Sequence, residues 1–154
     1  MSSTVYVDAD SCPVKEEIIT LCDQYQKELV FVFSYAHNMV LPQQVKTVQV
    51  DVDKEAADLY LLQTVRRGDI CISQDHALAS LLIIKGTIVL SPRGHVYKEE
   101  EMSSMLQSRY ASQKARRAGK KTKGPRKFTT EDREQFAQSL EYALKRDNDR
   151  NEKE

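Results

Sequence analysis

The sequence predicts an α/β domain with a mainly parallel central sheet, and two observations lead to this prediction. Short apolar runs alternate with segments whose apolar residues recur at helical spacing, which favours a sheet with helices on both sides. The run at residues 29–33 is apolar at every position, as in strands that are buried on both faces. With 154 residues, 40% of them hydrophobic, the chain is long enough for one sizeable core.

The first half of the chain is expected to contain three strands and two helices. A strand at residues 4–8 ends in an acid, and a helix follows from Val14 to near Gln26, with Ser11 as its N-cap and Pro13 in its first turn. Strands at residues 29–33 and 45–52 come next. The second helix covers residues 54–65 and is expected to end in a basic last turn before Gly68.

The second half begins with the same alternation and then changes character. A strand at residues 70–73, a third helix at 74–84 closed by Gly86, and a strand at 87–90 complete the alternating part. Residues 99–109 are expected to be helical. Thr129 and Asp132 resemble the ends of a capping box at the start of a last helix. That helix is expected to pack on the domain or on a partner through a narrow apolar stripe: Phe136, Leu140, Ala143 and Leu144.

These elements suggest three parts of the chain. An α/β domain is expected at residues 1–110, a basic linker at 111–128, and a C-terminal helix with a charged tail at 129–154.

The formal net charge is zero, but the charges are unevenly distributed. Residues 1–101 hold nine Lys and Arg against fifteen Asp and Glu, residues 102–130 hold nine against none, and residues 131–154 hold five against eight. A positive block between two acidic blocks favours contact with a polyanion, so nucleic acid is the expected partner, RNA before DNA. The candidate contacts form the basic run: Lys114, Arg116, Arg117, Lys120, Lys121, Lys123, Arg126 and Lys127.

Composition excludes several other classes of protein. No apolar run approaches the roughly 20 residues that span a bilayer, and the first eight residues lack the features of a signal peptide, so a cytoplasmic location is expected. Cys12, Cys22 and Cys71 match neither a disulfide framework nor a zinc pair, and they are expected to be reduced and buried. The sequence leaves the oligomeric state open.

Acidic residues occur where ligands collect in parallel α/β sheets, after strands and near the starts of helices. Carboxylates gathered at one sheet edge repel one another unless a cation neutralises them, and hard oxygen ligands favour Mg²⁺ or Mn²⁺. The expected metal ligands are Asp8, Asp10, Asp58 and Asp75, with Glu55 as a further candidate. Asp8, Asp58 and Asp75 are the expected catalytic residues.

Each of these acids also suits a plainer role as a turn residue or helix cap, Asp75 as the cap of the third helix. Asp51, Asp53 and Asp69 are interpreted as turn acids. Arg93, which follows the last strand, is a candidate contact for a substrate phosphate or an ordinary turn arginine.

Five motifs, in order along nearly the whole chain, resemble the YaiI/YqxD family, a bacterial group considered PIN-like. They lie at residues 8–15 (Asp-Ala-Asp-Ser-Cys-Pro-Val-Lys), 55–58 (Glu-Ala-Ala-Asp), 68–75 and 92–94 (Pro-Arg-Gly), and in Gly124-Pro125 with Phe128 and Asp132-Arg133. The resemblance implies a PIN-like three-layer domain. It also implies the usual activity of PIN-like domains, Mg²⁺- or Mn²⁺-dependent cleavage of nucleic acid, with Asp8, Asp58 and Asp75 at the positions of the acids and Asp10 in support. Glu55 stands where the family more often has Asp, and Leu59 where it often has another acid.

Two other functions remain open at this point. An apolar strand followed by Asp-x-Asp is also the opening of haloacid-dehalogenase-like phosphatases, with Asp8 as nucleophile and Asp10 as acid. That class needs a later strand ending in paired acids, whereas Asp69 precedes its strand and Asp75 stands alone. The other alternative is a non-catalytic nucleic-acid-binding protein that keeps the fold and the basic run, and Leu59 is the feature that favours it.

Overall fold

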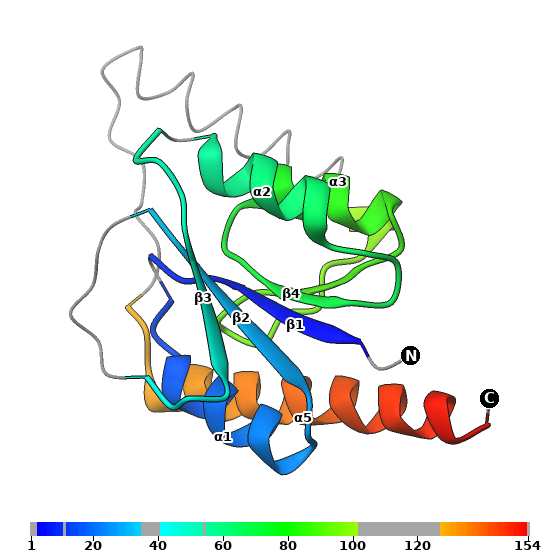
Figure 1. Cartoon of the computed structure of the whole chain (residues 1–154). Helices are drawn as coiled ribbons and strands as arrows, with labels where there is room; N and C mark the ends of the chain where they lie inside the picture. Colours follow the sequence, from blue (N-terminus) through cyan, green and yellow to red (C-terminus); the bar gives the residue numbers. More distant parts are fainter. Residues whose placement is uncertain (1–2, 11, 35–40, 54, 102–126, 154) are drawn as a thin grey trace.

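The fold is a three-layer α/β sandwich in which a five-stranded, all-parallel sheet lies between two layers of helices (Figure 1). The computed structural model describes residues 3–10, 12–34, 41–53, 55–101 and 127–153. The strand order is β3-β2-β1-β4-β5, which makes β1 the central strand. This architecture confirms the expected mainly parallel sheet and agrees with the PIN-like three-layer fold that the resemblance implies.

The elements lie close to the positions expected from the sequence. The strands are β1 (Thr4–Asp8), β2 (Glu28–Phe33), β3 (Val45–Gln49), β4 (Ile70–Ile72) and β5 (Ile88–Leu90). The helices are α1 (Lys15–Gln24), α2 (Ala56–Thr64), α3 (His76–Ile84) and α5 (Thr130–Lys153). The helix expected over residues 99–109 begins at Glu99, and most of it lies outside the described residues.

Two expected helix ends need correction. Helix α1 has Val14 at its N-cap position and no side-chain cap, while the expected cap, Ser11, lies outside the described residues. Helix α2 ends at Thr64 because Val65 turns into an extended conformation, so no basic residue lies in its last turn. Gly68 adopts a left-handed conformation (φ +88°) three residues after Val65, in the turn that leads into β4.

Alternate residues of each strand face opposite helix layers, and each face has its own apolar core. Val7, Phe31 and Ile72 belong to the core on the side of α1 and α5. Val32 and Cys71 belong to the core on the side of α2 and α3. Because both faces are covered, the central strands are apolar at nearly every position, as the run at residues 29–33 predicted.

Helix α5 is part of the first core and lies beside α1 on the same face of the sheet (Figure 1). Its apolar stripe is buried as expected, with Phe136, Leu140 and Leu144 fully shielded from solvent. Farther along the helix, Asp147 forms an ion pair with the almost fully buried Lys27 at the start of β2. The stripe therefore packs on the domain, which settles the choice between the domain and a partner.

The chain connections of β1 and β4 make these two neighbouring strands the switch point of the sheet. The chain leaves β1 towards α1 on one face, and it leaves the neighbouring β4 towards α3 on the other face (Figure 1). In open α/β sheets, such a switch point between two adjacent strands is where ligands bind, beyond the carboxyl ends of the strands. Asp8 is the last residue of β1 and Asp75 follows β4, so the fold places both at this switch point.

None of the helices in the described ranges is long and apolar enough to cross a membrane.

Candidate functional site

Asp8 lies at the centre of the carboxyl edge, between the ends of β2 and β4. The hydroxyl of Ser73, the residue after β4, donates a hydrogen bond to Asp8 Oδ2 at 3.2 Å. Partial burial raises the pKa of Asp8 above its usual value, the hydrogen bond from Ser73 acts in the opposite direction, and the charges of Asp10 and Asp75 raise it further. The Asp8 carboxylate is therefore held in an environment that disfavours its negative charge.

Asp10 is fixed from the other neighbouring strand. The backbone N–H of Ser34, which follows β2, donates to both carboxylate oxygens of Asp10, at 3.1 and 2.9 Å, and the Ser34 hydroxyl donates to Oδ2. Because β2 is hydrogen-bonded to β1 in parallel register, its end delivers these donors to the loop after Asp8. The pair after the first strand is thus tied to strands on both sides.

Asp75 combines the two roles considered for it. Its carboxylate accepts the Leu78 N–H at 3.1 Å, which confirms it as the N-cap of α3. Its own N–H donates to Ser73 Oγ at 3.1 Å, so Ser73 links Asp75 directly to Asp8. The Asp75 charge also raises the pKa of Asp8. Asp75 is therefore both the cap of α3 and a member of the acidic site.

Asp58 belongs to α2, in the helix layer that covers the Val32 and Cys71 face of the sheet. It lies half-buried in the first turn of α2. Burial raises the pKa of the Cys71 thiol in β4, and the charges of Asp8 and Asp58 both raise it further. The two carboxylates thus act on the same buried thiol. Glu55 occupies the N-cap position of α2, where its side chain is exposed and makes no capping hydrogen bond.

The chemistry of these donors fits a hard divalent cation. The Ser73 hydroxyl contacts Asp8, and a cation would relieve the repulsion that the charges of Asp10 and Asp75 exert on it. Within the described part of the chain, however, no three His, Cys, Asp or Glu side chains stand close enough together to hold a metal ion. A bound metal would therefore have to draw the acidic side chains inwards from the positions seen here.

The sequence did not single out Ser34 and Ser73, which hold Asp10 and Asp8. Each directly follows a strand of the parallel sheet, so the rule that pointed to the acids could also have pointed to these hydroxyls. Tyr97 was also missed. Its hydroxyl donates to the Ser73 carbonyl at 3.4 Å, and its pKa is raised to about 12 by burial and by the charge of Asp75.

The structure places the other predicted residues as follows. Arg93 donates from Nη1 to Asp132 Oδ2 at 2.7 Å, at the start of α5, so it contributes to the docking of that helix, and a phosphate contact stays a prediction. Asp69 accepts the N–H groups of Thr4 and Arg66, which confirms it as a turn acid. All three cysteines are buried free thiols, as expected. Lys127 is exposed, and the rest of the basic run, Lys114 to Arg126, lies outside the described residues.

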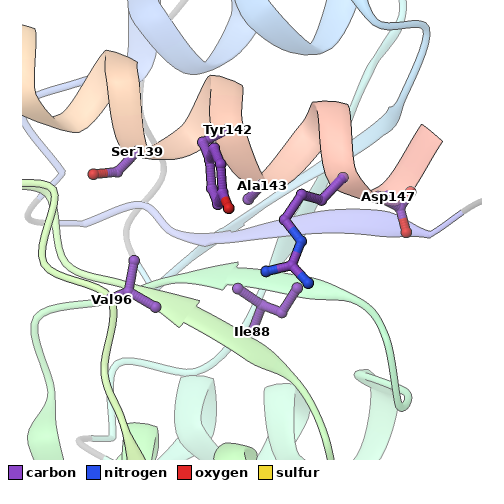
Figure 2. A pocket seen from close by; sticks show the side chains of 7 residues that line it. Ile88, Val96, Ser139, Tyr142, Ala143 and Asp147 are labelled. Atoms are coloured by element: carbon purple, nitrogen blue, oxygen red, sulfur yellow. The ribbon is translucent and has the colours of Figure 1, made fainter. Parts of the chain in front are cut away.

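A groove of about 250 Å³ lies away from the acids, between α5 and the edge strand β5 (Figure 2). Ile88, Val96 and Ala143 form its apolar part, and Tyr142 and Arg146 lie along it. The groove includes Ile88, at the amino end of β5, whereas Asp8 and Asp75 lie at the carboxyl edge, and neither acid lines it.

Comparisons with known proteins match almost the whole chain. A family model described as "Uncharacterized BCR, YaiI/YqxD family" matches residues 6–146. A UPF0178 protein of Shouchella clausii is 68% identical over 143 residues, which cover 93% of this chain and 92% of that protein. UPF0178 proteins of Halalkalibacterium halodurans (49% over 140 residues; 91% and 89%) and Listeria welshimeri (46% over 132 residues; 86% and 89%) are also similar. No solved structure matches the chain significantly.

Proposed function

The chain belongs to the YaiI/YqxD family, and we propose that it is a metal-dependent nuclease that hydrolyses phosphodiester bonds in RNA or DNA. The observation that carries the proposal is the environment of Asp8. Its carboxylate lies at the switch point of a parallel sheet, where burial and the charges of Asp10 and Asp75 raise its pKa. Acids whose charges act on one another at the expected place for a ligand support a cation site.

Mg²⁺ or Mn²⁺ would be held by Asp8, Asp10, Asp58 and Asp75, with Glu55 one turn away from Asp58. Such an ion supplies a positive charge that orients a water molecule and offsets charge on the leaving oxygen of a phosphodiester. The protein's own contribution is to keep the carboxylates in place. Ser73 donates to Asp8, and Ser34 donates to Asp10, so both acids are held by hydroxyls from the strands on either side.

The substrate class is supported by charge. The block of residues 102–130 carries nine Lys and Arg and no acid, and Lys127 at its end is exposed on the surface. Contacts of this kind bind the phosphate backbone without reading base sequence. We therefore expect cleavage with little sequence preference, and RNA is the first substrate to test.

The decisive experiment measures cleavage of end-labelled RNA and DNA, single- and double-stranded, with Mn²⁺ and with EDTA. Wild-type protein is expected to cleave only with metal, and Asp8→Asn is expected to lower kcat by about two orders of magnitude or more, because it removes a charged ligand. Asp23→Asn, an exposed acid on α1, is the matched control and should leave activity unchanged. Absence of Mn²⁺ binding in the wild type, together with equal behaviour of Asp8→Asn, would refute the proposal.

The same samples separate the two alternatives. A phosphatase of the haloacid-dehalogenase type would hydrolyse p-nitrophenyl phosphate and trap beryllofluoride on Asp8, with Asp10 as proton donor. The Asp10 carboxylate accepts hydrogen bonds from both the backbone N–H and the hydroxyl of Ser34. These contacts suit a hydrogen-bond acceptor and not the proton donor that the phosphatase mechanism needs. A non-catalytic binder would retain RNA binding and show no cleavage with any metal. That outcome would be explained by Leu59, an exposed residue next to Asp58 that stands where the family often has another acid.

A further inference from the structure

We propose that Arg133 is a positioning residue for the acidic site, acting through the loop that follows Asp8 and carries Asp10. The cation site that Arg133 would position rests on the proposed function. The contacts of Arg133 are independent of it.

Arg133 lies in the first turn of α5, yet it contacts the loop between β1 and α1. Its Nη1 donates to the carbonyl of Pro13 at 2.9 Å and to Glu17 Oε1, in α1, at 2.9 Å. Pro13 is three residues after Asp10, so this hydrogen bond fixes the far end of the loop whose near end carries Asp10. Strand β2 holds the loop from one side through Ser34, and α5 holds it from another through Arg133.

The guanidinium of Arg133 is itself held in a cluster, which we call the arginine clamp: Arg93, Phe128, Asp132 and Arg133. The Phe128 ring centroid lies 5.2 Å from the Arg133 guanidinium carbon and 5.5 Å from that of Arg93, both within cation–π range. Arg93 pairs with Asp132, which also forms the capping box of α5 with Thr129. The orientation of Arg133 is therefore determined by an aromatic ring and by the start of a well-docked helix.

Glu17 lies in the first turn of α1, directly after the loop that begins beyond Asp8, and it carries the charge that Arg133 balances there. Arg133 balances Glu17, whose side chain is only 22% exposed and whose Oε2 has no hydrogen-bond partner among the described residues. Removing Arg133 would therefore have two effects. The loop would lose a contact, and the negative charge of Glu17 would no longer be balanced.

These two effects have opposite signs for cation binding, which makes the proposal testable. An uncompensated Glu17 near the site would by itself attract a cation and strengthen binding. A loosened loop would weaken it, because the ligands must then be ordered when the metal binds. Weaker binding in Arg133→Gln therefore reports on position and not on charge.

The first measurement is Mn²⁺ affinity, by calorimetry or by electron paramagnetic resonance. Arg133→Gln is expected to weaken binding about tenfold, as changes behind metal ligands commonly do. Arg133→Lys, with one ammonium to share between Pro13 and Glu17, should recover part of the loss. Arg146→Gln is the matched control. Arg146 also lies on α5 and over an aromatic ring, with its guanidinium carbon 5.8 Å from the Tyr142 ring centroid, but it lines the remote groove.

Leu140→Val controls for looser packing of α5, since Leu140 is fully buried in the helix stripe and is not part of the clamp. Both controls are expected to change the affinity less than twofold. Stronger Mn²⁺ binding in Arg133→Gln, or an equal loss in Leu140→Val, would overturn the proposal.

A second measurement needs no metal. In the metal-free protein, the Cys12 N–H donates to the Ala9 carbonyl at 3.4 Å within the loop, and Arg133→Gln is expected to speed its hydrogen exchange several-fold, whereas Arg146→Gln should not. If wild-type protein binds no Mn²⁺, the proposed function fails while this exchange still tests the contact. Unchanged exchange at Cys12 would refute the positioning role whatever the metal result.

Discussion

Gly94 offers a sharp test of how α5 is docked on the sheet. The glycine has φ +89° in the turn after β5, and a Cβ added there would lie 2.7 Å from the carbonyl carbon of Gln135 and 2.8 Å from the Phe136 nitrogen. A left-handed conformation costs an alanine about 1–2 kcal/mol, and forcing an atom into backbone adds about 1–3 kcal/mol. Gly94→Ala is therefore expected to lower the free energy of unfolding by about 2–5 kcal/mol.

Two other glycines separate these contributions, because they have nearly the same backbone conformation. Gly68 (φ +88°) has nothing within 4 Å of an added Cβ, so Gly68→Ala should cost only the strain of about 1–2 kcal/mol. At Gly86 (φ +89°) the Cβ would meet Arg67 Cγ at 2.8 Å, in an exposed, flexible side chain that can move away. The expected order of cost is Gly68→Ala, then Gly86→Ala, then Gly94→Ala.

Urea unfolding followed by far-ultraviolet circular dichroism measures all three, and it suits a chain without tryptophan. An equal cost at Gly94 and Gly68 would show that the turn and α5 are not in close contact, and it would refute the docking described here. An unchanged slope against urea in the three variants would confirm that the comparison concerns the native state.

Three further predictions concern charges. Burial and the charges of Asp10 and Asp75 raise the folded-state pKa of Asp8, so stability is lost as the pH rises from the unfolded to the folded pKa of this residue. Asp8→Asn should therefore have a higher Tm than the wild type at pH 7 in EDTA. Thermal scans should show this difference vanish at low pH, where Asp8 is protonated in both states. Asp132→Ala removes the carboxylate half of the α5 capping box and the partner of Arg93, and it should cost roughly 2–4 kcal/mol in urea unfolding. RNA binding by fluorescence anisotropy should weaken with salt, and Lys127→Gln, at an exposed lysine, should reduce the slope of log K against log salt by about one; a salt-independent affinity would contradict the role of the basic run.

The candidate site shows where prediction from sequence succeeds and where it stops. Asp8 and Asp75 could be placed at one sheet edge, because parallel strands direct all their carboxyl ends the same way. Asp10 followed from the same reasoning, whereas a site role for Asp58, in the first turn of α2, stays a prediction. Their partners could not be predicted, since Ser34 and Ser73 contact the acids only through the order in which strands β2, β1 and β4 pair.

Arg93 illustrates the opposite case. Its place after a strand predicted a phosphate contact or an ordinary turn, and the sequence could not choose between them. The partner that the structure gives it, Asp132, is 39 residues further along the chain. Arg133 is harder still to interpret from sequence, because the loop it contacts is 120 residues earlier.

What the sequence by itself determined is local: the apolar periods that make strands and helices, the glycine turns, the capping box of Thr129 and Asp132, and the acids at strand ends. These features depend on neighbours within a few residues, so a single chain displays them. Only the tertiary structure decided which face α5 covers, that Lys27 and Asp147 form a buried ion pair, and that α5 holds the loop of the acids. Such contacts join segments far apart in the chain, and the physical reason they escape the sequence is that packing, not local propensity, selects them.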